Sequence, residues 1–165
     1  MSNRESSPAG SLPPGSMAPG SMAEAGYAGD VEPQESWERL SLDQAAQLID
    51  VRTMAEWNFV GIPDLAPLKR QALLCQWQLF PPAANSDFIE QAKAALKATA
   101  YRPDAPLFFL CRSGARSRAA AIAMTAAGFG PCFNIADGFE GGLDASRHRG
   151  GAGGWKASGL PWIQT

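Results

Sequence analysis

The order of the expected strands and helices predicts an α/β protein, with a mainly parallel sheet of about five strands flanked by helices on both faces. Two observations support this prediction. The unbroken apolar run APLFFLC, at 105–111, is typical of a strand that is buried on both faces. Two helical segments alternate with the candidate strands, one amphipathic at 86–100 and one rich in alanine at 116–128. Parallel sheets gather reactive groups just beyond the carboxyl ends of their strands.

Short local patterns define the first half of the sheet. Residues 27–31 predict an edge strand, and Pro33 suits the first position of the helix that follows it. The β-rich segments 47–51 and 72–80 predict two more strands, the second of which is stopped by a pair of prolines.

The second half continues the alternation. Asp87 and Glu90 form a capping signal for the helix at 86–100, and Gly128 is a natural C-cap for the alanine-rich helix. PCFNI, at 131–135, predicts the last strand, and the chain then ends in a short helical turn and a tail.

Length and composition predict one domain. The chain has 165 residues, of which 45% are hydrophobic, so it can build a real core. We assign this domain to residues 27–165 and interpret residues 1–26, which are rich in Ser, Pro and Gly, as a disordered tail.

The overall charge and hydropathy exclude several partners. A net charge of −2 gives no electrostatic basis for binding nucleic acid. No apolar run is long enough to cross a membrane, and the N-terminus lacks the apolar segment of a secretory signal. We therefore expect a cytoplasmic protein with neither nucleic acid nor membrane as a partner.

The segment CRSGARS, residues 111–117, carries the chemistry that the sequence suggests. If its backbone curls around the Cys111 sulfur, several N–H groups and the positive end of the next helix point at that sulfur and stabilise a thiolate. Gly114 permits the tight turn. The serines can donate further hydrogen bonds, and the arginines attract a small anion. The candidate binding loop is therefore Arg112, Ser113, Gly114, Ala115, Arg116 and Ser117.

The cysteines do not pair in any metal-binding pattern. Cys75, Cys111 and Cys132 form no CxxC pair, and His148 is the only histidine, so we expect no metal site and no disulfide scaffold. Free thiols in a reducing compartment fit this composition. We expect Cys75 and Cys132 to be buried core thiols, although either could resolve a modified Cys111 by forming a disulfide.

Four segments together resemble the rhodanese-like sulfurtransferases over about residues 27–163. They are LIDVRTMAEW at 48–57, CRSGARS at 111–117, NIADGFEGG at 134–142 and WKASGLPW at 155–162. The resemblance implies that Cys111 is the catalytic nucleophile and takes up a sulfane sulfur as a persulfide. It also implies that the loop amides and Arg116 bind the persulfide or the donor.

The same resemblance implies the reaction partners. The donor is a small anion such as thiosulfate or another sulfane sulfur compound, and the acceptor is cyanide, a thiol or a protein. Such enzymes need no metal or organic cofactor.

Three residues near the second expected strand match the family's D-V-R signature and the acidic residue after it. These are Asp50, Arg52 and Glu56. One interpretation is that they brace the loop from below. The interpretation that we favour is an Arg52–Glu56 ion pair that stabilises the fold. The family's glycine–histidine–isoleucine segment is replaced here by Gly-Ile-Pro at 61–63, which affects only an accessory contact.

Two other classes of function compete with sulfur transfer. Cysteine phosphatases, and by analogy arsenate reductase-like enzymes, also use a cysteine–arginine loop, but the phosphatases place five residues between the two. Here four residues separate Cys111 from Arg116, which suits a single sulfur atom better than a phosphate. The third alternative is a non-enzymatic persulfide carrier or binding module.

Overall fold

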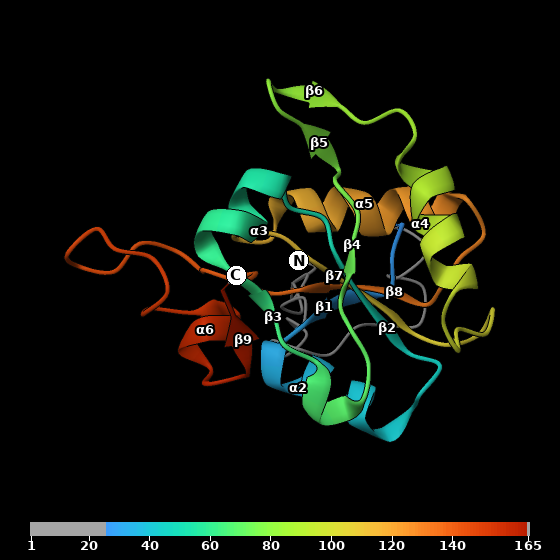
Figure 1. Ribbon diagram of the computed structural model, residues 1–165, viewed down its shortest axis with the longest axis horizontal. Coiled ribbons are helices and arrows are strands. Elements are labelled where there is room, and N and C mark those ends of the chain that lie inside the picture. Colours follow the sequence, from blue (N-terminus) through green and yellow to red (C-terminus); the bar gives the residue numbers. More distant parts are fainter. Residues whose placement is uncertain (1–25, 165) are drawn as a thin grey trace, which may run out of the picture.

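A five-stranded parallel sheet forms the centre of the computed structural model, which describes residues 26–164 (Figure 1). Each pair of neighbouring strands runs parallel. The strands, in spatial order, are β1 (Gly29–Val31), β8 (Cys132–Ile135), β7 (Leu107–Leu110), β2 (Gln47–Asp50) and β4 (Leu73–Leu74). The predicted fold class is confirmed. The tail expected at 1–26 lies outside the described residues, apart from Gly26.

Helices cover both faces of this sheet (Figure 1). One face packs against α4 (Phe88–Lys97) and α5 (Ala115–Ala126), and the other against α2 (Pro33–Leu42) and α6 (Gly154–Ala157). Strand β7 is fully buried because its side chains alternate between the two cores. This alternation explains its unbroken apolar sequence, and it places Cys111, the residue after β7, on the α4 and α5 side.

The remaining elements are short. They are α3 (Met54–Val60), β3 (Ile62–Pro63), the 3-10 helix η1 (Ala66–Leu68), β5 (Gln78–Leu79), β6 (Ala83–Ala84) and β9 (Trp162–Ile163). Strands β3 and β9 form an antiparallel ribbon, so 131–135 is not the last strand of the chain. Strands β5 and β6 form a hairpin that projects from the sheet (Figure 1).

The strand expected over 72–80 is wrong beyond Leu74. Its neighbour β2 ends at Asp50, so the sheet offers little further backbone to pair with. The chain makes two more hydrogen bonds to that strand's end, from the N–H groups of Cys75 and Trp77, and then leaves the sheet. The Trp77 ring packs edge-on against Phe88 of α4, with ring centroids 5.0 Å apart.

The capping signal at Asp87 and Glu90 predicted the start of the helix correctly, but the capping hydrogen bond does not form. Asp87 is the N-cap of α4, but its side chain makes no capping hydrogen bond. A complete capping box forms instead at α3, between Thr53 and Glu56. Among the helices of residues 26–164, none combines the length and apolar character that a membrane crossing requires.

The short helix α6 contributes a major part of the core on the face of the sheet that α2 and α6 cover. Trp155 is fully buried, and its indole N–H donates to the Pro161 carbonyl at 2.8 Å. Trp155→Ala should lower the free energy of unfolding by about 3–5 kcal/mol, as measured by urea denaturation. Trp162→Ala is the matched control, because 39% of Trp162 is exposed, and its loss should be clearly smaller. Equal losses would show that α6 does not anchor this core.

Candidate functional site

The carboxyl end of β7 holds a cysteine at the start of a tight loop. Cys111 is only 1% exposed, and its Sγ atom accepts a hydrogen bond from the Gly114 N–H at 3.1 Å. The Ser117 hydroxyl lies at the same distance from Sγ. Gly114 is the N-cap of α5 with φ of +114°, the positive φ that the sequence predicted. The loop thus aims an amide and a helix start at one sulfur atom.

A turn at 138–141 holds this loop from behind. The Phe139 N–H donates to the Cys111 carbonyl at 2.7 Å. The Glu140 and Gly141 N–H groups both donate to the Arg112 carbonyl, at 3.0 and 3.1 Å. In a planar trans peptide the N–H points opposite to the C=O. The turn holds the carbonyl groups of both residues. The N–H group that follows each carbonyl in the same peptide unit must therefore point to the other side of the loop.

Close contact with the loop explains why this turn needs a glycine. Gly138 has φ of +62°, and a Cβ atom there would lie 2.4 Å from the Cys111 carbonyl oxygen. No side chain fits at that distance without moving the loop backbone. In the sequence, this segment carries a family resemblance but no pattern that predicts a structural role.

Glu56 pairs with the arginine at the far end of the loop. Its carboxylate accepts from both terminal nitrogens of Arg116, at 2.7 and 2.8 Å. The expected Arg52–Glu56 pair is therefore wrong, because the α3 capping box turns Glu56 toward α5. Burial alone would raise the pKa of Glu56, but the hydrogen bonds from Arg116 and Thr53 outweigh it and lower this pKa to about 2. The same pair raises the pKa of Arg116.

Asp50 and Arg52 form a second, fully buried ion pair below the loop. The Arg52 Nη2 atom lies 2.6 Å from the Asp50 carboxylate and 2.8 Å from the Gly61 carbonyl. The guanidinium group stands 4.1 Å from the ring centroid of Phe139, whose N–H holds the Cys111 carbonyl. These two residues thus brace the loop indirectly, through Phe139.

A chain of polar groups leads from the sulfur to the sheet edge. The Ser117 hydroxyl lies 2.6 Å from Asn134 Oδ1, and Asn134 Nδ2 donates to Asp30 at 3.1 Å. Asp30 also accepts from the Tyr27 hydroxyl at 2.9 Å. Sequence reasoning missed this chain, because it requires β1 and β8 to be neighbours.

The other two cysteines lie too far from Cys111 to form a disulfide with it. Cys132 is opposite Leu107, which lies four residues before Cys111, so the two cysteines are about 13 Å apart along the strands. Cys75 is level with Cys111 but on the far side of β2, at about 10 Å. A disulfide needs Cα atoms within about 7 Å. Burial also raises the pKa of each of these two thiols to about 11.

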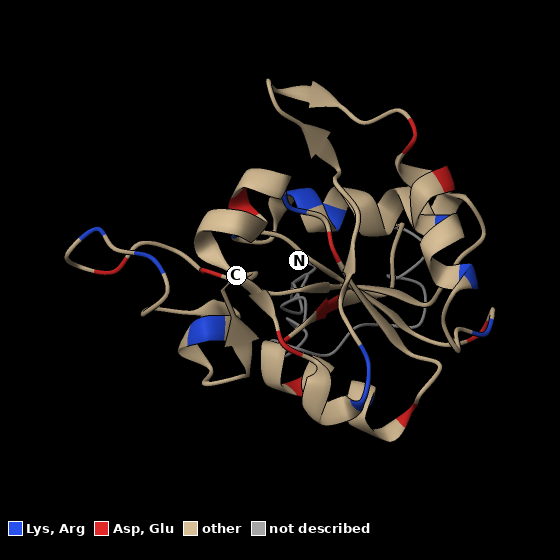
Figure 2. Ribbon diagram, viewed as in Figure 1, with Lys and Arg blue, Asp and Glu red and all other residues tan. Residues whose placement is uncertain are grey.

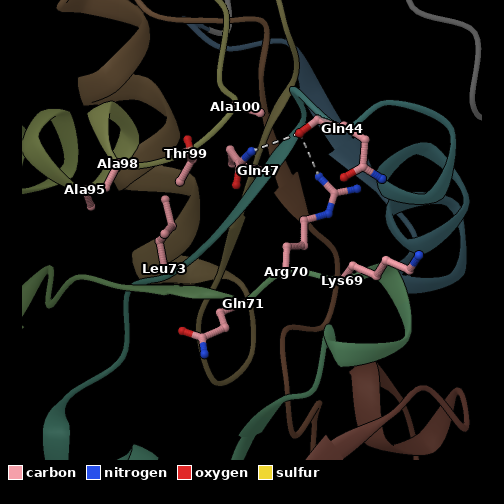
Figure 3. A pocket seen from close by; sticks show the side chains of 10 residues that line it. All are labelled: Gln44, Gln47, Lys69, Arg70, Gln71, Leu73, Ala95, Ala98, Thr99 and Ala100. Atoms are coloured by element: carbon pink, nitrogen blue, oxygen red, sulfur yellow. Dashed lines mark hydrogen bonds between the residues drawn. The ribbon is translucent and has the colours of Figure 1, made fainter.

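The hollow shown in Figure 3 lies at the amino-terminal end of β2, whereas Cys111 follows the carboxyl end of β7. It has a volume of about 430 Å³, and Gln47, the first residue of β2, is among its lining residues. The Arg70 guanidinium in this hollow donates to the Ala46 carbonyl. A second hollow of about 500 Å³ lies between α3 and the β5–β6 hairpin, and Met54, Phe59 and Phe80 are among its lining residues.

Positive and negative charges meet at the start of α5. Figure 2 shows basic residues there beside an acidic position on α3. Arg112 is exposed and takes part in no ion pair within residues 26–164.

Within residues 26–164, no group of three or more His, Cys, Asp or Glu side chains is arranged to hold a metal ion.

Comparisons with known proteins place this architecture among relatives. Residues 29–165 match the family model described as the STR4 middle domain. The chain is 39% identical to an uncharacterized RP600 homolog from Rickettsia rickettsii and 37% identical to RP600 from Rickettsia prowazekii. Each match spans 128 residues, which is 78% of this chain and 91% of the relative.

Two solved structures share the fold. Rv0390 from M. tuberculosis is 47% identical, with a TM-score of 0.74, over 84% of this chain and 99% of that one. A polysulfide-sulfur transferase homodimer from Wolinella succinogenes is 19% identical, with a TM-score of 0.53, over 88% and 87% of the two chains.

Gly138→Ala should destabilise the protein by about 3 kcal/mol, because it combines a positive φ with a clash against the loop backbone. Gly128→Ala is the matched control, since Gly128 also has a positive φ but its added Cβ would meet no atom within 4 Å. That control should lose about 1 kcal/mol. Urea denaturation measures both, and similar losses would remove the role assigned to the turn.

The Glu56–Arg116 pair should make stability depend on acid. The pKa of Glu56 falls from 4.5 to about 2 on folding, so its contribution is complete above pH 4.5 and is lost as the pH falls toward 2. Glu56→Gln should cost about 2 kcal/mol at pH 7. The difference between the two proteins in urea denaturation should shrink as the pH falls below 4.5. A difference that stayed constant down to pH 2 would contradict the pair.

Proposed function

The chain belongs to the STR4 middle domain family, and from this premise we propose that it is a rhodanese-like sulfurtransferase that carries sulfane sulfur on Cys111. The observation that carries the proposal is the hydrogen bond from the Gly114 N–H to Sγ at the start of α5. Amides and the positive end of a helix stabilise charge on a sulfur in this position. The fold, which is shared with the polysulfide-sulfur transferase from W. succinogenes, is compatible with this chemistry.

The reaction runs in two displacements. In the first, the Cys111 thiolate attacks the outer sulfur of a donor such as thiosulfate. The Sγ–S bond forms, the S–S bond of thiosulfate breaks, and sulfite leaves with the bonding electron pair. In the second, cyanide or a thiolate attacks the outer sulfur of the persulfide and releases the Cys111 thiolate. Charge and sulfur balance in both steps without a metal or an organic cofactor.

Arg112 is the better candidate for drawing in an anionic donor. It is exposed at the loop and makes no ion pair with the described residues. Arg116, by contrast, has both terminal nitrogens bound to Glu56. We therefore assign Arg116 to holding the end of the loop, and Arg112 to raising the local concentration of the donor.

Loop length favours sulfur over phosphate as the transferred group. With four residues between Cys111 and Arg116, the loop offers room for the single outer sulfur of a persulfide. A phosphate has three outer oxygens and needs a wider ring of amides. The near-complete burial of Cys111 also restricts access to a small, protruding donor atom.

Intact-protein mass spectrometry after treatment with thiosulfate tests the proposal. The wild type should gain the mass of one sulfur atom and lose it on addition of cyanide, whereas Cys111→Ser should gain none. Cys75→Ser and Cys132→Ser are matched controls and should still load sulfur, because neither thiol lies near the loop.

Two results would reject this function. One is full sulfur loading by Cys111→Ser. The other is hydrolysis of an aryl phosphate through Cys111 at an enzymatic rate, with no sulfur taken from thiosulfate or polysulfide. The second result would establish the phosphatase alternative.

A further inference from the structure

We propose that Asp30 and Asn134 are positioning residues that fix the direction of the Ser117 hydrogen bond and thereby favour persulfide over bare thiolate at Cys111. This inference rests on the proposed function and deepens it, because it makes the protein a carrier that retains its sulfur. It follows from which groups in the polar chain can donate hydrogen bonds.

Asp30 determines how the Asn134 amide is turned. An ionised carboxylate can only accept, and Asp30 accepts from Asn134 Nδ2 at 3.1 Å and from the Tyr27 hydroxyl at 2.9 Å. The amide nitrogen of Asn134 therefore faces Asp30. Its oxygen must then face the other way, toward Ser117.

Asn134 in turn determines where Ser117 sends its proton. Asn134 Oδ1 can only accept, and it lies 2.6 Å from Ser117 Oγ, a distance that requires a proton between the two oxygens. The Gly114 carbonyl, at 3.2 Å from Oγ, is a second pure acceptor. Ser117 has one proton, so it presents a lone pair to the Cys111 sulfur at 3.1 Å.

The three forms of Cys111 respond differently to this lone pair. A thiol donates its proton to Ser117, so every group is satisfied. A bare thiolate faces the lone pair directly, and turning the hydroxyl toward it would leave two oxygens 2.6 Å apart without a proton. A persulfide carries its charge on the outer sulfur, one bond farther from Ser117. Loading therefore removes the conflict.

Burial makes this conflict costly. Water has almost no access to these groups, because the exposed fractions are 1% for Cys111, 0% for Ser117 and 4% for Asn134. It therefore cannot donate the missing hydrogen bond to the sulfur or to the hydroxyl. Other charges also face the loop, namely the Arg116–Glu56 pair from α5 and α3, the Asp50–Arg52 pair from the end of β2, Arg112 and the exposed Asp137. Of these, only Asp137 changes among the variants compared below, where it serves as the control.

The first test uses Asp30→Asn. An asparagine at 30 can donate to Asn134 Oδ1, so the Asn134 amide is free to turn over and Ser117 can donate to the thiolate. At a pH where unloaded Cys111 is ionised and at a fixed ratio of thiosulfate to sulfite, the ratio of persulfide to unloaded enzyme in mass spectrometry should fall about fivefold, the value of one hydrogen bond. At a lower pH, where the thiol predominates, the unloaded enzyme should instead react up to about fivefold faster with iodoacetamide, because its thiolate fraction rises.

Asp137→Asn is the matched control for charge. Asp137 is exposed beside the loop with φ of +61°, a conformation that asparagine tolerates, and it lies outside the polar chain. This substitution removes one negative charge, as Asp30→Asn does. It should change neither the ratio of persulfide to unloaded enzyme nor the rate of reaction with iodoacetamide. Reaction of Cys75 and Cys132 with iodoacetamide reports any general loosening of the fold and should stay absent.

Ser117→Ala tests the direction of the hydrogen bond by its sign. Removing a lone pair that opposes the thiolate should speed alkylation, whereas removing a donor to the thiolate would slow it. A rate at or below that of the wild type overturns the proposal, as does an Asp30→Asn protein that behaves like Asp137→Asn. Failure of the wild type to take up any sulfur rejects the proposed function instead, and the alkylation rates still decide the direction at Ser117.

Discussion

The hydrogen bond from the Phe139 N–H to the Cys111 carbonyl is the contact on which the candidate site depends. It fixes the first peptide of the loop, and through it the side to which the following amide points. Arg52 stacks on the Phe139 ring, and its charge is neutralised by Asp50. This buried ion pair therefore helps to hold Phe139 in the position from which its N–H group binds the Cys111 carbonyl. Gly138 completes the arrangement by letting the two backbones touch. The loop is thus shaped by its supports more than by its own sequence.

Closing the far end of the loop has a chemical consequence. The Glu56 carboxylate occupies the Arg116 guanidinium in the geometry that an anionic donor would otherwise use. The loop gains a fixed end, and under the proposed function the exposed Arg112 attracts the anionic donor in its place. An arginine that the sequence predicts to bind a ligand can therefore have a structural role instead. Only the identity of its partner distinguishes a binding role from a structural one.

Local patterns predicted the parts of the molecule that depend on nearby residues. The apolar run at β7, the glycine turn at Gly114 and the helix that follows were all predicted, because each is set by neighbours in sequence. The Thr-x-x-Glu signature at Thr53 was equally local and was overlooked. The partner of Glu56 could not be predicted, because it depends on how α3 is oriented toward α5. Nor could the link between Asp30 and Asn134, which are 104 residues apart.

That last separation bears on the order in which the protein becomes competent. Strand β1 is synthesised early in the described part of the chain, yet its partner β8 follows about a hundred residues later. Cys111 and its loop emerge before β8 does, without Asn134 to orient Ser117. Under the proposed function, this orientation of Ser117 is therefore acquired only when β8 pairs with β1. A nascent or partly unfolded chain would hold the cysteine without that control, so completion of the sheet would precede sulfur carriage.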